Sequence, residues 1–487
     1  MTVSEPSVTP GVNARDGADA VNAVKDRFER REHTVAPVRN TQLEAVIREL
    51  GWSQDRLAAQ VRRTAAEAGA SELLSVTRSH IAQWLRGSRP SGRAPAILCE
   101  ALSRGLGRPV SPAEIGLTDH GRDTTTWDSD PVSALANFRD DMLGRRPLLF
   151  SVLAATVPGP AWWGDRRDHA RNRAPVVALT VSEAHVEALR DAAEFYSRQD
   201  QRLGGRAGRT SLRAYLGTDV AAYLTGRPTS ERVRTDLLAA AGQLTYLDGW
   251  MAFDGGDQGG AQQSFGLALA LAAEADDPAL AGHILRAQAH QALDLGHPRA
   301  ALRFADASVD NPRYTAASPR ERALLGVVHA RALAATGRKP DAMAALHRAE
   351  HDLSAADSGK DREPARVAFF AEASLAHETA LTLRALGDLR GAEEEMRRSV
   401  RTRQRASART HAVTLGYLGA VQAQRGHIDE ACSTWHTALD AMDGIQSGRT
   451  RDIVQQMRSA LSPVRSRGGS AATQLDARAR EVLQAIG

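Results

Sequence analysis

Apolar side chains recur at helical spacing through most of this chain. From about residue 181 onward the sequence is rich in Ala and Leu, poor in strand-forming residues and periodic throughout, which predicts helices. Short amphipathic segments also follow one another closely between about residues 41 and 117. The pattern predicts an all-α fold with a small N-terminal domain at 41–117, a large helical domain at 181–470 and a C-terminal helix at 471–487.

Two stretches lack this periodicity and set the domain boundaries. Residues 1–40 mix Pro, Gly, Ser, Asp and Arg, a composition typical of a disordered arm. Residues 118–180 begin with the polar run "TDHGRDTTTWDSDP", which indicates a linker. The apolar run that follows, "PLLFSVLAATVPGPAWW", is too short to cross a membrane and is expected to dock on a neighbouring surface.

A longer repeat runs through the C-terminal domain. Five segments each place a glycine, a small residue five positions later, an apolar residue four beyond, and Ala or Ser three further. Glycine suits a left-handed helix end, and alanine suits a close helix crossing. The glycines are Gly256, Gly296, Gly337, Gly387 and Gly426, and the alanines are Ala261, Ala301, Ala342, Ala392 and Ala431.

This order resembles the second half of the tetratricopeptide repeat over roughly residues 235–445. The resemblance implies an α-solenoid of stacked helical hairpins, with residues 181–232 and 447–487 as flanking helices that cap the stack. The glycine spacings of 40, 41, 50 and 39 residues exceed the usual ~34, which indicates longer helices or loops than in the family. The alternative is an Ala-rich helical bundle without repeat geometry.

The N-terminal domain contains three predicted helices. In "ELGWSQDRLAAQV", Ser53 is placed to cap a helix with a buried face of Leu57, Ala58 and Val61. In "SVTRSHIAQWLRG", Thr77 is placed to cap a second helix. The segment "APAILCEALSRGLG" predicts a third.

Charge clusters in the same domain. The formal net charge of +4 is small for 487 residues, so a nucleic-acid signal must come from local clustering. Between Arg78 and Arg108 there are six arginines and one acid, Glu100. This sign suits phosphate.

These two capped helices, followed by a glycine and a basic loop, resemble the helix-turn-helix of the xenobiotic-response-element class. The resemblance implies that Gln54 contacts backbone phosphate, that Thr77 caps the recognition helix, and that Arg78 and Ser79 read base edges, with Gln83 one turn on. Arg78 suits guanine and Gln83 suits adenine. Arg86 and Arg89 are better placed to bind phosphate.

One departure from that family is large. Gln54 and Arg78 are 24 residues apart, where the family usually has about a dozen, so "RRTAAEAGASELL" lengthens the first helix or its turn. Either the insertion lies away from the DNA, or the motif no longer binds. The alternative for the whole domain is a small helical unit with a solvated arginine face.

The first helices of the repeats predict a concave groove. Its aromatic end and cationic middle suit an extended peptide or an acidic protein segment, since arginine binds carboxylates with two parallel hydrogen bonds. The alternative for each residue is packing or a solvated helix face. The candidates are Tyr246, Trp250, Phe253, His283, Arg286, His290, Arg331, His377 and Arg384.

Other chemistries find little support. "LGGRAGRTS" resembles a phosphate loop, but Leu203 replaces the first glycine and Arg209 the lysine. His347 and His351 are one turn apart without a third ligand, so we expect no metal site. No Gly-x-Ser-x-Gly motif occurs, and we expect neither an enzyme nor a cofactor. The two cysteines are far apart and no ~18-residue apolar window exists, which favours a soluble cytoplasmic protein.

Together these features predict a sequence-specific regulator of transcription that binds double-stranded DNA as a homodimer and receives a peptide or protein in its repeats. Such fusions resemble peptide-sensing regulators and the actinomycete regulators that restrain sporulation and antibiotic production, which implies a repressor. Only three of 62 basic residues are lysine, and this bias favours the second group. The alternative is an interaction scaffold with a degenerate helix-turn-helix that sequesters a protein partner.

Overall fold

The computed structural model describes residues 39–67, 70–106, 110, 114–117, 130–138, 157–357, 363–404, 407–465 and 470–486. Over these residues the chain is all-α, as predicted, apart from one parallel pairing of two-residue strands, β1 (Thr180–Val181) and β2 (Arg227–Pro228). Nearly all of the predicted disordered arm, most of the predicted linker and residues 147–156 of the docking segment lie outside the described residues.

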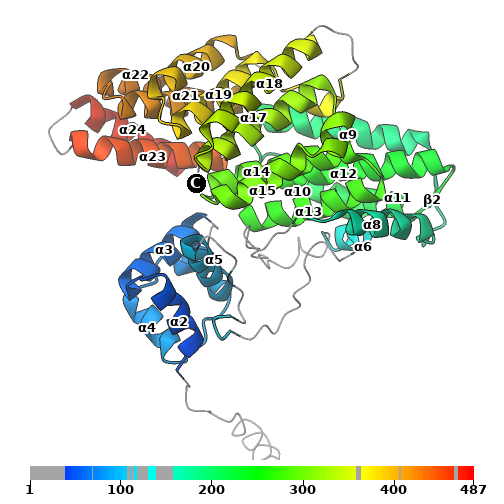
Figure 1. Cartoon of the computed structure of the whole chain (residues 1–487), viewed down its shortest axis with the longest axis horizontal. Helices are drawn as coiled ribbons and strands as arrows, with labels where there is room; N and C mark the ends of the chain where they lie inside the picture. Colours follow the sequence, from blue (N-terminus) through cyan, green and yellow to red (C-terminus); the bar gives the residue numbers. More distant parts are fainter. Residues whose placement is uncertain are drawn as a thin grey trace, which may run out of the picture.

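The N-terminal unit is a cluster of short helices around its own core (Figure 1). Its apolar side chains extend from Leu43 to Leu117 and form a cluster separate from those of the rest of the chain. The elements are α2 (Thr41–Glu49), α3 (Gln54–Glu67), η1 (Ser71–Leu73), α4 (Arg78–Leu85) and α5 (Ala94–Leu106).

Local capping explains where these helices begin. The Asn40 side chain accepts a hydrogen bond from the Leu43 N–H at 2.9 Å at the start of α2. Ser53 accepts one from the Arg56 N–H at 3.1 Å before α3, which confirms its predicted role. Each cap satisfies an N–H group that has no partner within its helix.

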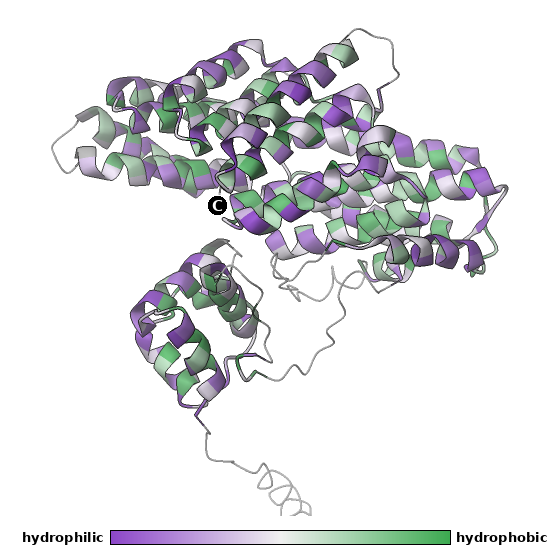
Figure 2. Ribbon diagram, in the orientation of Figure 1, coloured by the Kyte–Doolittle hydropathy of each residue, from purple (hydrophilic) through white to green (hydrophobic). Residues whose placement is uncertain are grey.

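The rest of the chain is a stack of helical hairpins. Figure 2 shows apolar and polar positions alternating along most of these helices, so each presents an apolar side to its neighbours. The five central hairpins pair α12 (Glu231–Gly255) with α13 (Gln258–Glu274), α14 (Pro278–Asp294) with α15 (Pro298–Ser308), α17 (Pro319–Ala335) with α18 (Lys339–Asp357), α19 (Glu372–Ala385) with α20 (Leu389–Thr402), and α21 (Ala408–Gln424) with α22 (Ile428–Ala441).

The repeat positions have the geometry that the sequence predicts. All five repeat glycines have φ between +79° and +88°, a conformation that side chains disfavour. All five repeat alanines are fully buried. The extra repeat length goes partly into two inserted short elements, α16 (Asn311–Ala316) and η3 (Ala365–Val367).

Flanking helices extend and close the stack. Before the hairpins, α6 (Pro131–Ala136) and α8 (Pro160–Asn172) pack against α13, which is where the described end of the docking segment lies. At the other end, α23 (Gly448–Arg465) packs against α21 and α24 (Ser470–Ile486) packs against α22. Between α9 and α12 lie three short elements, α10 (Arg209–Tyr215), the π-helical turn η2 (Leu216–Val220) and α11 (Ala221–Thr225).

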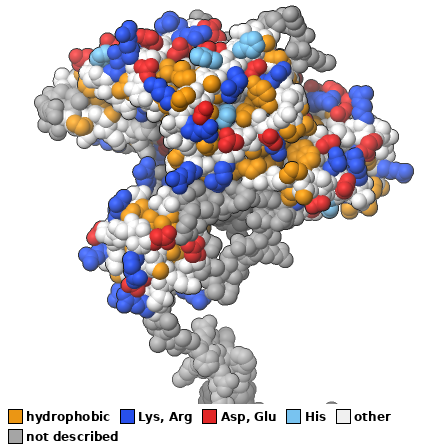
Figure 3. Space-filling view, viewed as in Figure 1, with side chains coloured by type: hydrophobic (Ala, Val, Ile, Leu, Met, Phe, Trp, Pro, Cys, Tyr) orange, Lys and Arg blue, Asp and Glu red, His pale blue; other side chains and the backbone are white. Residues whose placement is uncertain are grey.

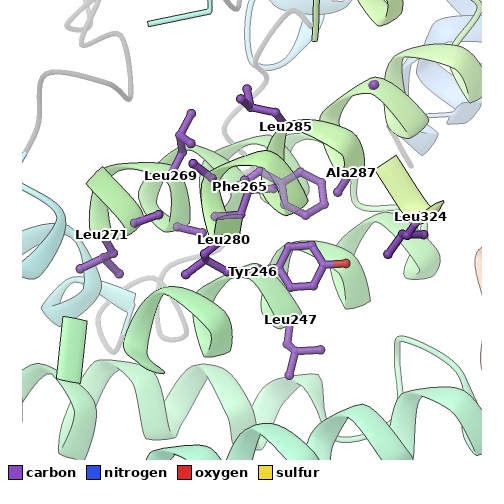
Figure 4. Packing of buried hydrophobic residues seen from close by; sticks show 14 of the residues in the cluster. Tyr246, Leu247, Phe265, Leu269, Leu271, Leu280, Leu285, Ala287 and Leu324 are labelled. Atoms are coloured by element: carbon purple, nitrogen blue, oxygen red, sulfur yellow. The ribbon is translucent and has the colours of Figure 1, made fainter. Parts of the chain in front are cut away.

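One helix joins the two ends of the hairpin series. The long helix α9 (Glu183–Leu203) contacts both α12 in the first hairpin and α21 in the fifth. Between the hairpins the interior is densely filled, as the stacked rings of Tyr246 and Phe265 in Figure 4 illustrate, with centroids 6.0 Å apart. The contacts of α9 with both ends of the series help to decide which side chains are exposed to solvent.

Candidate nucleic-acid interface and the predicted repeat groove

The start of α4 has the geometry of a capped helix. Thr77 is extended and precedes the first helical residue, and its N–H donates to His80 Nδ1 at 3.1 Å. Ile81 and Trp84 lie on the buried side of α4 within the N-terminal core. The first turn is therefore held by its cap and by the packing behind it, and its first residues, Arg78 and Ser79, are exposed.

The predicted base-reading and phosphate-binding residues lie in and around α4, except Gln54, which begins α3. Six of the seven are exposed, and Gln54 at the start of α3 is half-buried. In Figure 1, α4 lies on the side of the N-terminal unit away from the hairpin stack. The exposed six are Thr77, Arg78, Ser79, Gln83, Arg86 and Arg89.

Neighbouring acids neutralise part of the predicted arginine cluster. Arg93 donates from Nε and Nη2 to both carboxylate oxygens of Glu72, at 2.7 and 2.8 Å, which lowers the pKa of Glu72 to about 2. Arg104 pairs with Glu100 at 3.0 Å. The count of six arginines against Glu100 therefore overstates the charge available to a ligand, since Arg104 pairs with Glu100 one helical turn away and Glu72, outside the 78–108 window, pairs with Arg93.

Around α4 itself the positive charge is left largely available. Arg78 Nη1 lies 3.9 Å from Asp55 Oδ2, and both side chains are about 70% exposed (69% and 71%). Such exposed pairs contribute little, about 0–1 kcal/mol. Arg86 donates from Nε only to the Ala82 carbonyl in its own helix. Arg108 lies outside the described residues.

The long connection between α3 and α4 is ordered structure in its described part. Of its residues, Arg62 to Glu67 extend α3, and η1 follows after residues 68–69, which are not described. Ala65, Ala70 and Leu73 are buried in the N-terminal core, and Arg62 donates to the Val76 carbonyl at 2.6 Å. The extra residues thus lengthen both the first helix and the turn.

The predicted repeat groove is filled. Six of its nine candidates are buried in the interior, at 5% exposure or less, so the expectation that they line an open groove was wrong. Trp250, Arg331 and Arg384 are half-buried. The six buried residues are Tyr246, Phe253, His283, Arg286, His290 and His377.

The buried candidates pack against one another and against Trp250. Arg286 donates from Nη2 to the Tyr246 hydroxyl at 2.7 Å and lies 5.3 Å above the ring of Trp250. The rings of Trp250 and Phe253 meet His290 edge to face, with centroids 5.7 and 5.6 Å away. Aromatic and cation–π contacts of this kind stabilise a protein core as readily as they bind a ligand.

Acids from neighbouring hairpins neutralise the buried cations. Arg331 donates to Asp294 at 2.7 Å and lies 3.5 Å from Glu378. Burial opposes ionisation of Glu321, but a bidentate pair with Arg366 and the contact with His283 lower its pKa to about 2. Burial lowers the pKa of His283 to about 4 and holds the pKa values of His290 and His377 well below normal.

A buried triad closes the stack. Arg409 on α21 donates to Asp200 on α9 and to Asp254 on α12, both at 2.9 Å. All three side chains are at most 2% exposed. Burial raises the pKa of Asp200 to about 6, with Asp254 adding to the effect and Arg409 opposing it. Sequence analysis missed this triad because its members are up to 209 positions apart.

The remaining sequence candidates have structural explanations. The segment "LGGRAGRTS" contains a turn with buried glycines, in which the Gly205 N–H donates to Asp254 and the Arg206 N–H to the Gln446 carbonyl. His347 and His351 are exposed, and both cysteines are buried free thiols. Among the described residues, no helix combines the length and apolar character that a membrane crossing requires.

Two groups of carboxylates and histidine lie close enough together to hold a metal ion. In each, arginine already binds the carboxylates: Arg173 pairs with Asp130 and Glu274, next to His169. In the second group, Glu393 beside His427 and Glu430 accepts hydrogen bonds from Arg397 and Arg425. Because guanidinium groups occupy these acids, neither group favours a metal.

Comparison with known proteins gives one partial match. A family model described as the SP15 N-terminal domain matches residues 43–118. This range coincides with the N-terminal core, whose described apolar members extend from Leu43 to Leu117. Neither the curated proteins nor the solved structures yielded a match.

Proposed function

We propose that this chain is a sequence-specific DNA-binding regulator of transcription. The observation that carries the proposal is the exposed N-terminal turn of α4, where Arg78 and Ser79 extend from a capped helix on the free side of a separately packed unit. A helix end of this kind fits the major groove. Arg86 and Arg89 lie further along on the exposed surface, where they would bind phosphate.

The proposal assigns distinct roles to α3 and α4. Gln54 at the start of α3 binds a phosphate, and Arg78, Ser79 and Gln83 read base edges. The lengthened connection does not bury these residues: Ala65, Ala70 and Leu73 pack into the N-terminal core, and none of the six is buried. In this arrangement the insertion is compatible with DNA binding.

We also infer that the hairpins are tetratricopeptide-like repeats. The five left-handed glycines and five buried alanines at matched positions support the assignment. In the proposal, the repeats hold two chains together as a homodimer, so that two N-terminal units reach paired half-sites. A peptide or protein ligand then acts by favouring one arrangement of the two units. Repression, as the resemblance implies, is the proposed outcome.

Selection of bound sequences from a random duplex pool, followed by fluorescence anisotropy with the full chain, tests DNA binding. Arg78→Ala should lose about 1–3 kcal/mol of discrimination at one base pair, because a bidentate contact is removed. Arg89→Ala should weaken all duplexes alike and reduce the salt slope by about 1. Arg390→Ala is the matched control, since Arg390 is an exposed arginine on α20.

The rival function is a scaffold that sequesters a protein and does not bind DNA. The observation that favours it is the ordered insertion between α3 and α4, which departs from the usual turn. Absence of binding to every duplex at low salt, with Arg78→Ala indistinguishable from the parent chain, would favour the scaffold. Size-exclusion chromatography with light scattering tests the homodimer independently.

A further inference from the structure

A large cleft lies between the N-terminal unit and the rim of the hairpin stack. Its volume is about 1480 Å³, above the ~300–1,000 Å³ of small-molecule sites. One side is formed by the inserted connection, with Arg63, Ala66 and Leu74, and the opposite side by the turns and ends of helices near Gly256 and Arg449. None of the proposed DNA-binding residues lines it.

The lining is strongly cationic. Among the described residues it contains eight arginines, three aspartates and no glutamate. Some of these arginines are already neutralised: Arg93 by Glu72, and Arg209 and Arg213 by Asp248. In Figure 3, basic side chains gather along the edge of the stack that faces the N-terminal unit.

Other arginines in the cleft keep unused hydrogen-bond donors. Arg451 is half-buried and its side chain has no partner among the described residues. Arg449, by contrast, is enclosed: its guanidinium lies over the Phe253 ring and 4.0 Å from Asp294, and its Nε atom is buried. Arg206 is exposed and uses Nε on the Gly255 carbonyl, which leaves the outer nitrogens available. A guanidinium with free donors binds a carboxylate or phosphate strongly once water is excluded.

The rest of the lining favours a peptide. Five glutamines line the cleft, and their amides both donate and accept, as an extended backbone requires. Leu74, an exposed apolar side chain at 47%, together with the half-buried Leu295, provides apolar contact. A small polyphosphate would use the arginines but neither the amides nor the apolar surface.

We propose that this cleft binds an acidic peptide segment of a partner protein, with carboxylates on Arg206 and Arg451 and an apolar side chain against Leu74. The binding itself is independent of DNA. Its regulatory consequence rests on the proposed function: a peptide that contacts both units favours the arrangement seen here, in which Glu100 and His297 join them at 2.7 Å.

The test uses the full chain and a fluorescein-labelled twelve-residue peptide of Glu-Glu-Leu repeats. Anisotropy should report saturable binding that falls steeply with salt. Arg206→Glu combined with Arg451→Glu should weaken binding by about tenfold or more, because it reverses two charges facing the carboxylates. The matched control reverses Arg232 and Arg390, both 81% exposed and outside the cleft. Leu74→Asp should also weaken binding.

Three outcomes would overturn the proposal. They are equal affinity of the two double variants, equal affinity for a Gln-Gln-Leu peptide, and tighter binding of tripolyphosphate that displaces the acidic peptide. Arg78→Ala should bind the peptide like the parent chain. Peptide binding without DNA binding would therefore reject the proposed function alone, and DNA binding without peptide binding would reject the cleft alone.

Discussion

Arginine has opposite roles in the two parts of this molecule. In and just after α4 of the N-terminal unit, Arg78, Arg86 and Arg89 are exposed, and the one acid near Arg78 forms only a loose, solvated pair. In the hairpin stack, Arg286, Arg366 and Arg409 are enclosed and bonded to tyrosine, glutamate or aspartate. The same side chain is thus available to a ligand around α4 and structural in the interior of the stack. Burial and nearby acids decide which.

The largest effect should come from removing the arginine that closes the stack. Arg409→Ala leaves Asp200 and Asp254 buried without their cation, which should lower the free energy of unfolding by about 3–5 kcal/mol. Urea unfolding measures it. Arg390→Ala, which removes an exposed pair with Glu394, should change stability by less than about 1 kcal/mol. Similar effects of the two variants on unfolding would mean that the buried and the exposed arginine contribute equally to stability.

Stability should depend on pH through the buried histidines. The folded-state pKa of His283 is lowered to about 4, below the ordinary ~6.5, so only the unfolded chain takes up its proton between these values. His283 therefore contributes about 3 kcal/mol of stability that is present above pH ~6.5 and lost as the pH falls to ~4.

Asp200 gives stability the opposite dependence on pH. Its pKa is raised to about 6, so its contribution to stability increases as the pH falls from ~6 towards the ordinary ~4. The readout is therefore the difference between His283→Gln and the parent chain, from urea unfolding at pH 7.5 and pH 5. His347→Gln, at an exposed histidine, is the control. A difference that does not vary with pH would contradict the buried-histidine explanation.

The packing of the turn after α9 can be tested with two glycines that have similar backbone conformations. Gly204 and Gly256 have φ of +92° and +88°, but an added Cβ at Gly204 would lie 2.6 Å from the Gln446 carbonyl oxygen, whereas at Gly256 it meets nothing within 4 Å. Gly256→Ala should cost about 1 kcal/mol for the backbone alone. Gly204→Ala should cost about 1–3 kcal/mol more. Equal melting temperatures would indicate that the Gly204 turn is not packed as described.

The smallest stability effect is expected on α4. Arg78→Ala removes an exposed side chain whose pair with Asp55 spans 3.9 Å, so the free energy of unfolding should change by less than about 0.5 kcal/mol. The same variant should alter DNA discrimination in the assay proposed above. A loss of stability as large as that of Arg409→Ala would mean that the arginines of the two units do not differ.

The sequence predicted the local features of this fold well. The Ser53 cap, the buried face of Leu57 and Val61, and the left-handed glycines all depend on interactions within a few residues, and each is present. The candidate groove was not predictable in the same way. Helical spacing identified Tyr246, His283 and His290 as sharing one side of the first helices, but spacing does not show whether a neighbouring element covers that side.

The predicted arginine surface failed in part for a related reason. Counting charges between Arg78 and Arg108 omitted Glu72, which pairs with Arg93 across a turn. It also omitted the contact of Glu100 with His297, 197 positions away. Counting residues in a stretch of sequence gives its net charge. The electrostatic potential that a ligand meets depends on which of those charges are paired in the folded structure.

The sequence by itself determined the helices, their caps and the repeat positions of this protein, because backbone conformation and helix periodicity are set by neighbouring residues. Only the tertiary structure decided which arginines stay available and that the repeat interior is closed. Those outcomes depend on packing α9 against α21 and on partners such as Asp200, which the chain brings to Arg409 from 209 positions away. Burial and charge pairing are properties of that packing, and so they appear only once the chain has folded.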